Sequence, residues 1–191
     1  MQILKQQIKE NIIDSSRDYF IKEGYDKATL KDIADKADIS VGNIYRYFKS
    51  KEEILLEIMN RFKDNMSKYD FAHNNPLVEA SQKEYHEFIK VFTEIIVENY
   101  DDFRLTARNR QNEHVLEFKT FMMNLSVKTI KIAIPETRVD ETIARAWTVA
   151  TFEGLAELIV DAPKCDKKMA ERISIYFELV LKDIRKRIEV A

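Results

Sequence analysis

A stretch near the N-terminus, residues 40–51, has the composition of a surface that binds a polyanion. From Ser40 to Lys51 it holds three cations, Arg46, Lys49 and Lys51, and no acidic residue. Lys51 falls in the first turn of an expected helix, where the free N–H groups already favour an anion. A phosphate bound between Lys51 and that helix end would explain a cation at this place.

The side chains within this stretch are those that a DNA groove requires. On a helix over 41–48, Gly42, Asn43 and Arg46 share one face, and Tyr45 and Tyr47 flank them. Glycine lets a backbone approach closely, and Asn and Arg can pair with base edges. Tyrosine hydroxyls can reach phosphate oxygens. A helical hairpin with a solvated polar face is the alternative, but it leaves the acid-free run unexplained.

Capping residues predict the elements that position this surface. The expected helices span 30–37, 41–48 and 50–68, and Asp38 lies in the turn between the first two. Ile44 and Phe48 share the face of helix 41–48 that would pack on helix 30–37. The predicted caps are Thr29 with Asp32, Ser40, and Ser50 with Glu53.

The motif Thr29-x-x-x-Ile-Ala-x-x-Ala-x-Ile-Ser-x-Gly-x-Ile-Tyr-x-Tyr-Phe-x-Ser-Lys-Glu52 resembles the helix-turn-helix signature of the TetR family of repressors. The resemblance extends back through Gly24 and covers about residues 8–62. It departs from the family pattern at Asp38, where the family often has glycine.

The resemblance implies a homodimer that binds a palindromic, double-stranded DNA operator and releases it when a small molecule enters the C-terminal domain. Position by position, it implies phosphate contacts at Thr29, Ser40, Tyr45 and Lys51. It implies positions at or near base edges for Val41, Gly42, Asn43, Arg46 and Tyr47.

Composition limits where DNA can bind. The chain has 191 residues, a net charge of −2 and a pI near 6.0, so any DNA contact must be local. Residues 1–51 carry +2 and the remainder −4. The single Cys165 excludes an intrachain disulfide, and no signal peptide or membrane-length apolar run is visible, so we expect a cytoplasmic protein with no membrane partner.

The hydrophobic periodicity predicts an all-α fold of about nine helices. Besides the three helices above, we expect helices at 5–23, 77–98, 101–110, 113–133, 139–161 and 166–189, with a connector at 69–76. We assign 1–49 to a helix-turn-helix DNA-binding domain and 50–191 to a ligand-binding and dimerisation domain. The helix from residue 50 would join the two mechanically.

The last two helices predict a dimer interface. Helix 139–161 is apolar around most of its circumference, and helix 166–189 carries a long apolar stripe. Pairing both helices with their copies would form a four-helix contact between two chains. The alternative is that both stripes face the domain's own core.

Large apolar residues between 77 and 152 could line a pocket for a mostly apolar effector. Each of them is more simply a residue of an ordinary core, and Arg104, Arg108 and Arg110 could meet an anionic ligand but more simply form a solvated cluster. The candidate lining residues are Phe88, Phe92, Phe103, Phe118, Met122, Trp147 and Phe152.

Nothing in the sequence predicts an enzyme. His73, His86 and His114 are scattered with no partner at metal-ligand spacing, and no glycine-rich phosphate loop or nucleophile motif is present. We therefore expect no catalytic residues, metal site or cofactor. The rival to a DNA-binding regulator is a helical-bundle adaptor that binds only protein.

Overall fold

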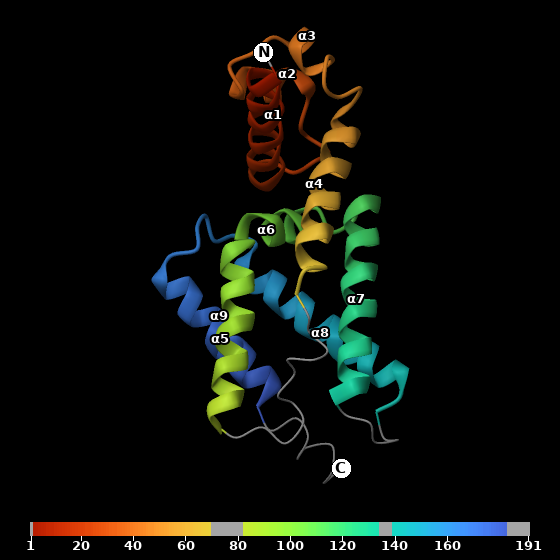
Figure 1. Cartoon of the computed structure of the whole chain (residues 1–191), viewed down its shortest axis with the longest axis vertical. Coiled ribbons are helices and arrows are strands. Elements are labelled where there is room, and N and C mark those ends of the chain that lie inside the picture. Colours follow the sequence, from red (N-terminus) through yellow and green to blue (C-terminus); the bar gives the residue numbers. More distant parts are fainter. Residues whose placement is uncertain (1, 70–81, 134–138, 183–191) are drawn as a thin grey trace.

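The computed structural model describes residues 2–69, 82–133 and 139–182, and these form nine helices, as the sequence predicts. Helices α1 (Gln2–Lys22), α2 (Leu30–Lys36) and α3 (Val41–Ile44) lie together at one end of the molecule (Figure 1). We call these three helices the head. Helix α4 (Lys51–Met66) runs from the head into the rest of the chain.

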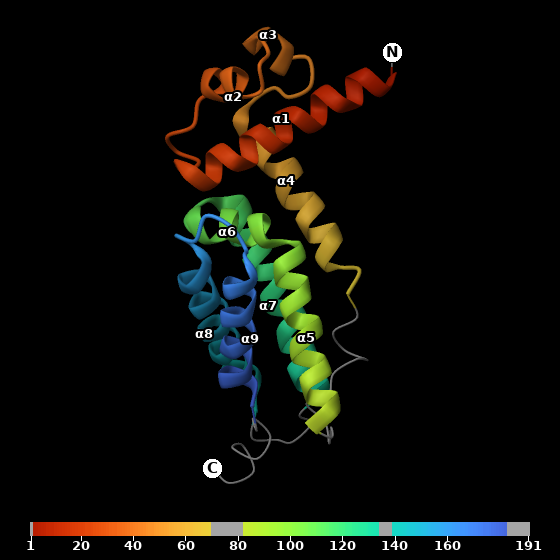
Figure 2. The ribbon, with the colours of Figure 1, turned by 90° about the vertical axis from the view of Figure 1, so that its left-hand side faces the viewer.

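The remaining helices form a bundle that we call the body. Its members are α5 (Gln82–Glu98), α6 (Tyr100–Arg108), α7 (Glu113–Ala133), α8 (Glu141–Ile159) and α9 (Lys167–Leu181). Helix α6 lies across the top of the bundle, between α1 and the other body helices (Figure 2). The head therefore rests on α6, which packs against both α1 and α8.

Residues with a left-handed backbone follow two helices of the head. Gly24 has φ +89° just after α1, and Tyr25 folds back so that its ring lies 5.3 Å from the ring of Phe20. Asp38 has φ +54° in the turn between α2 and α3, a conformation that aspartate tolerates better than most residues.

The third helix is shorter than predicted. We expected a helix over 41–48, but α3 ends at Ile44 and a tight turn follows. The amides of Arg46 and Tyr47 bond to carbonyls three residues back instead of four. Aromatic residues crowd this segment, and they lose side-chain freedom in an α-helix.

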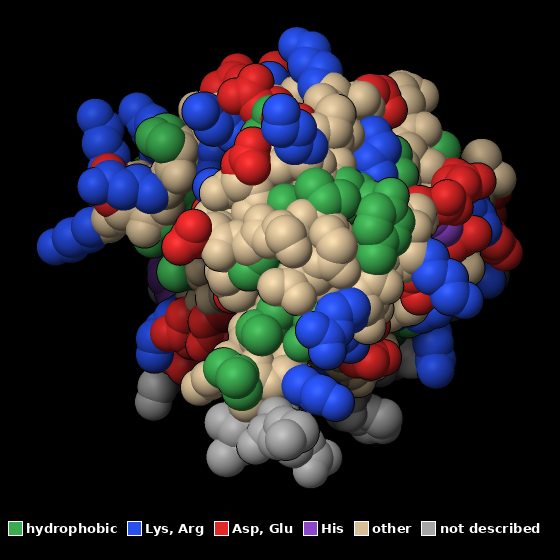
Figure 3. All heavy atoms as spheres, turned by 90° about the horizontal axis from the view of Figure 1, so that it is seen from above, with side chains coloured by type: hydrophobic (Ala, Val, Ile, Leu, Met, Phe, Trp, Pro, Cys, Tyr) green, Lys and Arg blue, Asp and Glu red, His purple; other side chains and the backbone are tan. Residues whose placement is uncertain are grey.

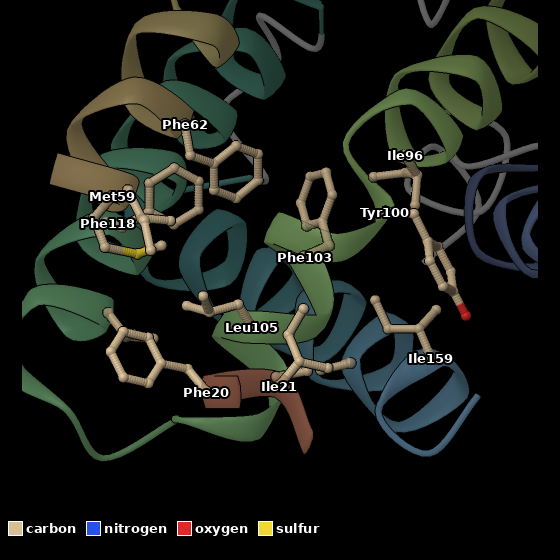
Figure 4. Close-up of a cluster of buried hydrophobic side chains, with 14 of the residues drawn as sticks. Phe20, Ile21, Met59, Phe62, Ile96, Tyr100, Phe103, Leu105, Phe118 and Ile159 are labelled. Atoms are coloured by element: carbon tan, nitrogen blue, oxygen red, sulfur yellow. The ribbon is translucent and has the colours of Figure 1, made fainter. Parts of the chain in front are cut away.

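One large cluster of buried residues spans both the head and the body. The Phe62 ring of α4 stacks on Phe118 of α7, at 4.3 Å, and meets Phe103 of α6 edge-on, at 4.9 Å (Figure 4). Phe20 of α1 and Leu105 of α6 belong to the same cluster. Because α4 contributes to the packing of both head and body, the division into 1–49 and 50–191 stays a prediction.

Candidate nucleic-acid interface and apolar cavity

Side-chain caps fix the orientation of α2 and α3. Thr29 Oγ1 accepts from the Asp32 amide, at 3.2 Å, while the Asp32 carboxylate accepts from the Thr29 amide, at 3.1 Å. The Thr29 hydroxyl also donates to the Asp32 carboxylate, at 2.5 Å, and this bond, together with the one from the Thr29 amide, holds the pKa of Asp32 below its usual value. Ser40 Oγ accepts from the Asn43 amide, at 3.2 Å. The predicted caps of both helices are confirmed.

The outward face of α3 and its following turn is polar and free of acids, as expected. Ile44 and Phe48 are buried against the head, so the residues between them turn outward. Gly42, Tyr45 and Arg46 are exposed. Val41, Asn43 and Tyr47 are half-buried, which leaves part of each side chain at the surface.

Figure 3 looks onto the head from the end that carries α2 and α3. Lys and Arg side chains lie at several places on this face, interspersed with Asp and Glu, and an uncharged area lies between them. That the nine predicted residues contact DNA stays a prediction.

Lys51 has internal contacts that the sequence did not indicate. Its Nζ donates to the carbonyls of Tyr25, at 2.8 Å, and Ala28, at 3.0 Å, and lies 4.3 Å from the centre of the Tyr25 ring. A third carbonyl, that of Asp26, lies at 3.4 Å. Lys51 therefore joins the α1–α2 loop to the start of α4. The position of α2 depends on this loop.

The cap of α4 also differs in part from the prediction. Ser50 Oγ accepts from the Glu53 amide, at 3.2 Å, as expected. The Glu53 carboxylate accepts from the amide of Lys49 instead of that of Ser50. The expected reciprocal bond is thus displaced by one residue, and it orders the segment that leads from α3 into α4.

Two polar contacts hold the head on α6. Asn109 follows α6, is 8% exposed, and its amide accepts from the Tyr25 N–H, at 2.7 Å, and donates to the Phe20 carbonyl, at 3.2 Å. Arg17 of α1 pairs with Asp102 of α6. Burial raises the pKa of Asp102 above its usual value, although Arg17 opposes the shift.

A second set of ion pairs joins α1 to α4. Lys9 pairs with Glu57, at 2.9 Å, and Arg61 pairs with both Glu57 and Glu10. The hydrogen bond from Arg61 lowers the pKa of Glu10, and that from Lys9 lowers the pKa of Glu57. Head movement relative to α4 would have to break this network.

An apolar cavity lies inside the body. It is partly open to solvent. Six of the seven predicted lining residues border it, namely Phe88, Phe92, Phe103, Met122, Trp147 and Phe152. Phe118 instead borders a neighbouring cavity, which shares Phe103, Met122 and Phe152 with the first.

The wall extends beyond the residues that the sequence predicted. Met66 of α4, and Phe177 and Leu181 of α9, also line the cavity. Three threonines, Thr129, Thr148 and Thr151, also line the cavity. Their position on otherwise apolar helix faces is the local signal that could have identified them. Each of these threonines donates its hydroxyl to its own helix, to the carbonyls of Leu125, Ala144 and Trp147.

The arginines of α6 make contacts within the body. Arg104 donates to the Pro163 carbonyl, at 3.1 Å, and Arg110 pairs with Glu153 and Glu157 of α8, both at 3.2 Å. Within the described ranges, none of Arg104, Arg108 and Arg110 lines either cavity. None of the described residues that line the larger cavity is charged.

Across residues 2–69, 82–133 and 139–182, no helix combines the length and apolar character needed to cross a bilayer. This agrees with the absence of a membrane-length apolar run in the sequence.

Comparison with known proteins connects this geometry to a family. A family model described as "Bacterial regulatory proteins, tetR family" matches residues 12–58, which cover the second half of α1, all of α2 and α3, and the first half of α4. The HTH-type transcriptional regulator QacR of Staphylococcus aureus is 40% identical over 53 residues, which make up 28% of each chain. The first curated relatives are matched over only 24–31% of their own length.

Solved structures show that the likeness in fold covers nearly the whole chain. The fatty acid degradation regulator FadR of Bacillus halodurans has a TM-score of 0.63 and 19% identity, over 93% of this chain and 96% of that one. FadR of Bacillus subtilis, solved with stearoyl-CoA, has a TM-score of 0.65 and 19% identity, over 92% and 98%. Residues 12–58 therefore carry the helix-turn-helix domain of the TetR family of bacterial regulatory proteins, and the chain as a whole shares the fold of these solved regulators.

Proposed function

We propose that this protein is a transcriptional regulator, most simply a repressor, that binds a palindromic operator through α2 and α3. The observation that carries the proposal is the exposed, acid-free surface from Ser40 to Lys51, held by capped helices on a buried base of Ile44 and Phe48. Arg46 and Asn43 would read base edges, and Tyr45 would reach a phosphate.

We infer that two copies bind together. Ile143 and Val149 of α8 and Ile175 of α9 are 51%, 44% and 49% exposed, which is unusual for large apolar side chains on neighbouring helices. Pairing α8 and α9 with their copies would cover them. The dimer would then present two α3 segments to successive major grooves, about 34–36 Å apart.

The proposed effector is a compound with a long apolar chain, and an acyl group fits best. The cavity wall is apolar, and its threonine hydroxyls already bond to their own helices. The fold resembles that of a FadR solved with stearoyl-CoA, which supports the same class of ligand. A charged head group would have to stay outside the larger cavity, because burying an unpaired charge is very costly.

The cavity has a direct route to the head. Met66 at the end of α4 and Phe103 of α6 both line it, and Phe103 also touches Phe62 of α4. A ligand that displaces these side chains would tilt α4 and change the separation of the two α3 segments, which would release the operator.

The test is binding of the full chain to a fluorescent duplex from the region upstream of its own gene. We expect Arg46→Ala to weaken binding at least tenfold and Asn43→Ala to relax preference at one or two base pairs. Arg108→Ala, a matched change on α6, should bind like the parent protein. If the parent binds this duplex and random duplex equally weakly at low salt, the protein is a protein-binding adaptor instead.

A further inference from the structure

His114 occupies an unusual environment at the point where α7 meets α4. Only 12% of its side chain is exposed. Both ring nitrogens are buried, and neither has a hydrogen-bond partner among the described residues. A buried imidazole that forms no hydrogen bond is costly, because at least one ring nitrogen carries a hydrogen that water would otherwise accept.

Carboxylates from two helices surround this ring. Glu52 Oε1 of α4 lies 3.5 Å from Nε2, and Glu117 Oε2 lies 3.9 Å from Nδ1. Glu113 lies on the same side, so that one ligand atom from each of Glu52, Glu113 and His114 falls within 4.8 Å of the others. Each of the two glutamates lies in the first turn of its helix, where the helix dipole favours a negative charge. The dipole does not explain why both lie beside a histidine that has no hydrogen-bond partner in the described part of the chain.

We propose that His114, Glu52 and Glu113 bind a divalent transition-metal cation, with Zn²⁺ as the best match. One imidazole and two carboxylates form a donor set that zinc accepts, whereas Mg²⁺ and Ca²⁺ prefer oxygen ligands alone. Ligand atoms ~2.0–2.2 Å from a tetrahedral zinc lie ~3.3–3.6 Å apart, close to the Nε2–Glu52 distance.

The surroundings of the site support a cation. Glu117, on the Nδ1 side, would accept the remaining imidazole N–H, as carboxylates commonly do for histidines that bind zinc. Burial raises the pKa of Tyr25, and the negative charges of Glu52, Asp26 and Glu113 raise it further, so these carboxylates concentrate negative charge here. The sequence could not predict the site, because His114 and Glu52 lie 62 positions apart.

The metal would join the start of α4 to the start of α7. Glu52 follows Lys51, which holds the α1–α2 loop, so the bound ion would fix the head against the body at one more point. An effect of the metal on operator affinity rests on the proposed function, but metal binding itself does not.

The experiment uses the full chain without an affinity tag, in metal-free buffer at neutral pH. Calorimetric titration with Zn²⁺ should give one site per chain with micromolar or tighter affinity, and Co²⁺ should give the visible absorption of a tetrahedral site. We expect His114→Gln and Glu52→Gln each to weaken zinc binding at least tenfold. His86→Gln, the same change at an exposed histidine of α5, should leave it unchanged.

The proposal is overturned if zinc binds no more tightly than Mg²⁺, or if both ligand variants bind zinc like the parent. Glu52 is 59% exposed, so Glu52→Gln should fold even if His114→Gln does not. Operator binding is measured separately, with and without zinc. Zinc binding without any change in operator affinity would support the site and exclude its regulatory role, whereas failure to bind DNA would count only against the proposed function.

Discussion

Arg17 of α1 donates a 2.8 Å hydrogen bond from Nε to Oδ1 of Asp102 in α6, across the junction between head and body. The Asp102 side chain is 18% exposed, whereas Arg17 has a second partner in Asp14, at 2.9 Å. Loss of the arginine would therefore leave a largely buried charge unpaired, but loss of the Asp102 charge would not.

This asymmetry predicts unequal effects on stability. Arg17→Met should lower the free energy of unfolding by about 3 kcal/mol, and Asp102→Asn by only about 1 kcal/mol. Burial already raises the pKa of Asp102, so in Arg17→Met this carboxyl should take up a proton readily as the pH falls. The loss of unfolding free energy caused by Arg17→Met should then become smaller in acid. Urea unfolding at several pH values would measure this change. Equal losses at neutral pH would contradict the asymmetry.

Acid should weaken the contact between α1 and α4. Arg61 and Lys9 lower the pKa values of Glu10 and Glu57 below the usual 4.5. The stability that these carboxylates contribute is therefore complete above pH 4.5 and is lost as the pH falls through their folded-state values. Because both are partly exposed, we expect only about 0.5–1 kcal/mol per pair. The difference in urea midpoint between the parent and Arg61→Gln should narrow below pH 4.5; a constant difference would exclude this origin.

Close packing of α8 on α9 predicts that a single methyl group is harmful. A Cβ at Gly154 would overlap the hydroxyl of Tyr176, which donates to the Thr151 carbonyl at 2.6 Å. Gly154→Ala should cost about 1–3 kcal/mol despite the better helix propensity of alanine. The double variant with Tyr176→Phe should recover part of the loss, since ring carbons would still lie 3.0–3.1 Å from the new methyl group. Thermal unfolding measures both, and a stabilised Gly154→Ala would show that the helices separate easily.

Variants of Lys51 and Lys49 can distinguish support of the α1–α2 loop from contact with DNA. Lys51→Ala should lower stability by about 1–2 kcal/mol, because three carbonyls lose their donor. Lys49→Ala changes an exposed side chain and should not alter stability. Both variants should weaken operator binding and lower its salt dependence by about one phosphate per chain. An unchanged salt slope for Lys51→Ala would mean that Lys51 supports the loop without contacting DNA.

Trp147 provides a reporter for the cavity, because it is the single tryptophan and lines the wall. Titration with palmitoyl-CoA should shift its emission to shorter wavelength. Ser126→Leu would fill part of the cavity and should weaken this binding about tenfold, whereas Thr120→Leu, on the exposed side of the same helix, should not. No emission change in the parent at saturating ligand, or equal binding by both variants, would exclude an acyl chain at this place.

Local signals predicted the helices and the caps of the head well. Thr29, Ser40 and Asp38 act within four residues of their partners, so their spacing in the sequence was sufficient. The predicted end of α3 was wrong because the spacing of apolar residues remains helical through Phe48. After Ile44, however, the amides of Arg46 and Tyr47 bond to carbonyls three residues back instead of four. The cap at Glu53 shifted for a similar reason, since a side chain can choose between adjacent amides.

Contacts between distant segments could not be read from the sequence. Asn109 meets Tyr25 across 84 positions and Arg17 meets Asp102 across 85, and nothing in either local pattern names the partner. Six apolar residues of the cavity wall were predicted, because aromatic residues on inward helix faces tend to lie near one another, but others such as Ile95, Leu125 and Leu155 were not. Which of them border empty space depends on packing, so Phe118 fell beside the larger cavity instead of on its wall.

The shared packing around Phe62 constrains how the protein can acquire a new effector over evolutionary time. Met66 and Phe103 line the cavity, and Phe103 packs on Phe62 of α4, so under the proposed function a change at either would alter affinity for ligand and for operator together. The rest of the wall comes from α5, α7, α8 and α9. Substitutions there can reshape the cavity without changing the packing that supports α4. Diversification of specificity should therefore concentrate on those four helices, and the inner faces of α4 and α6 should change less.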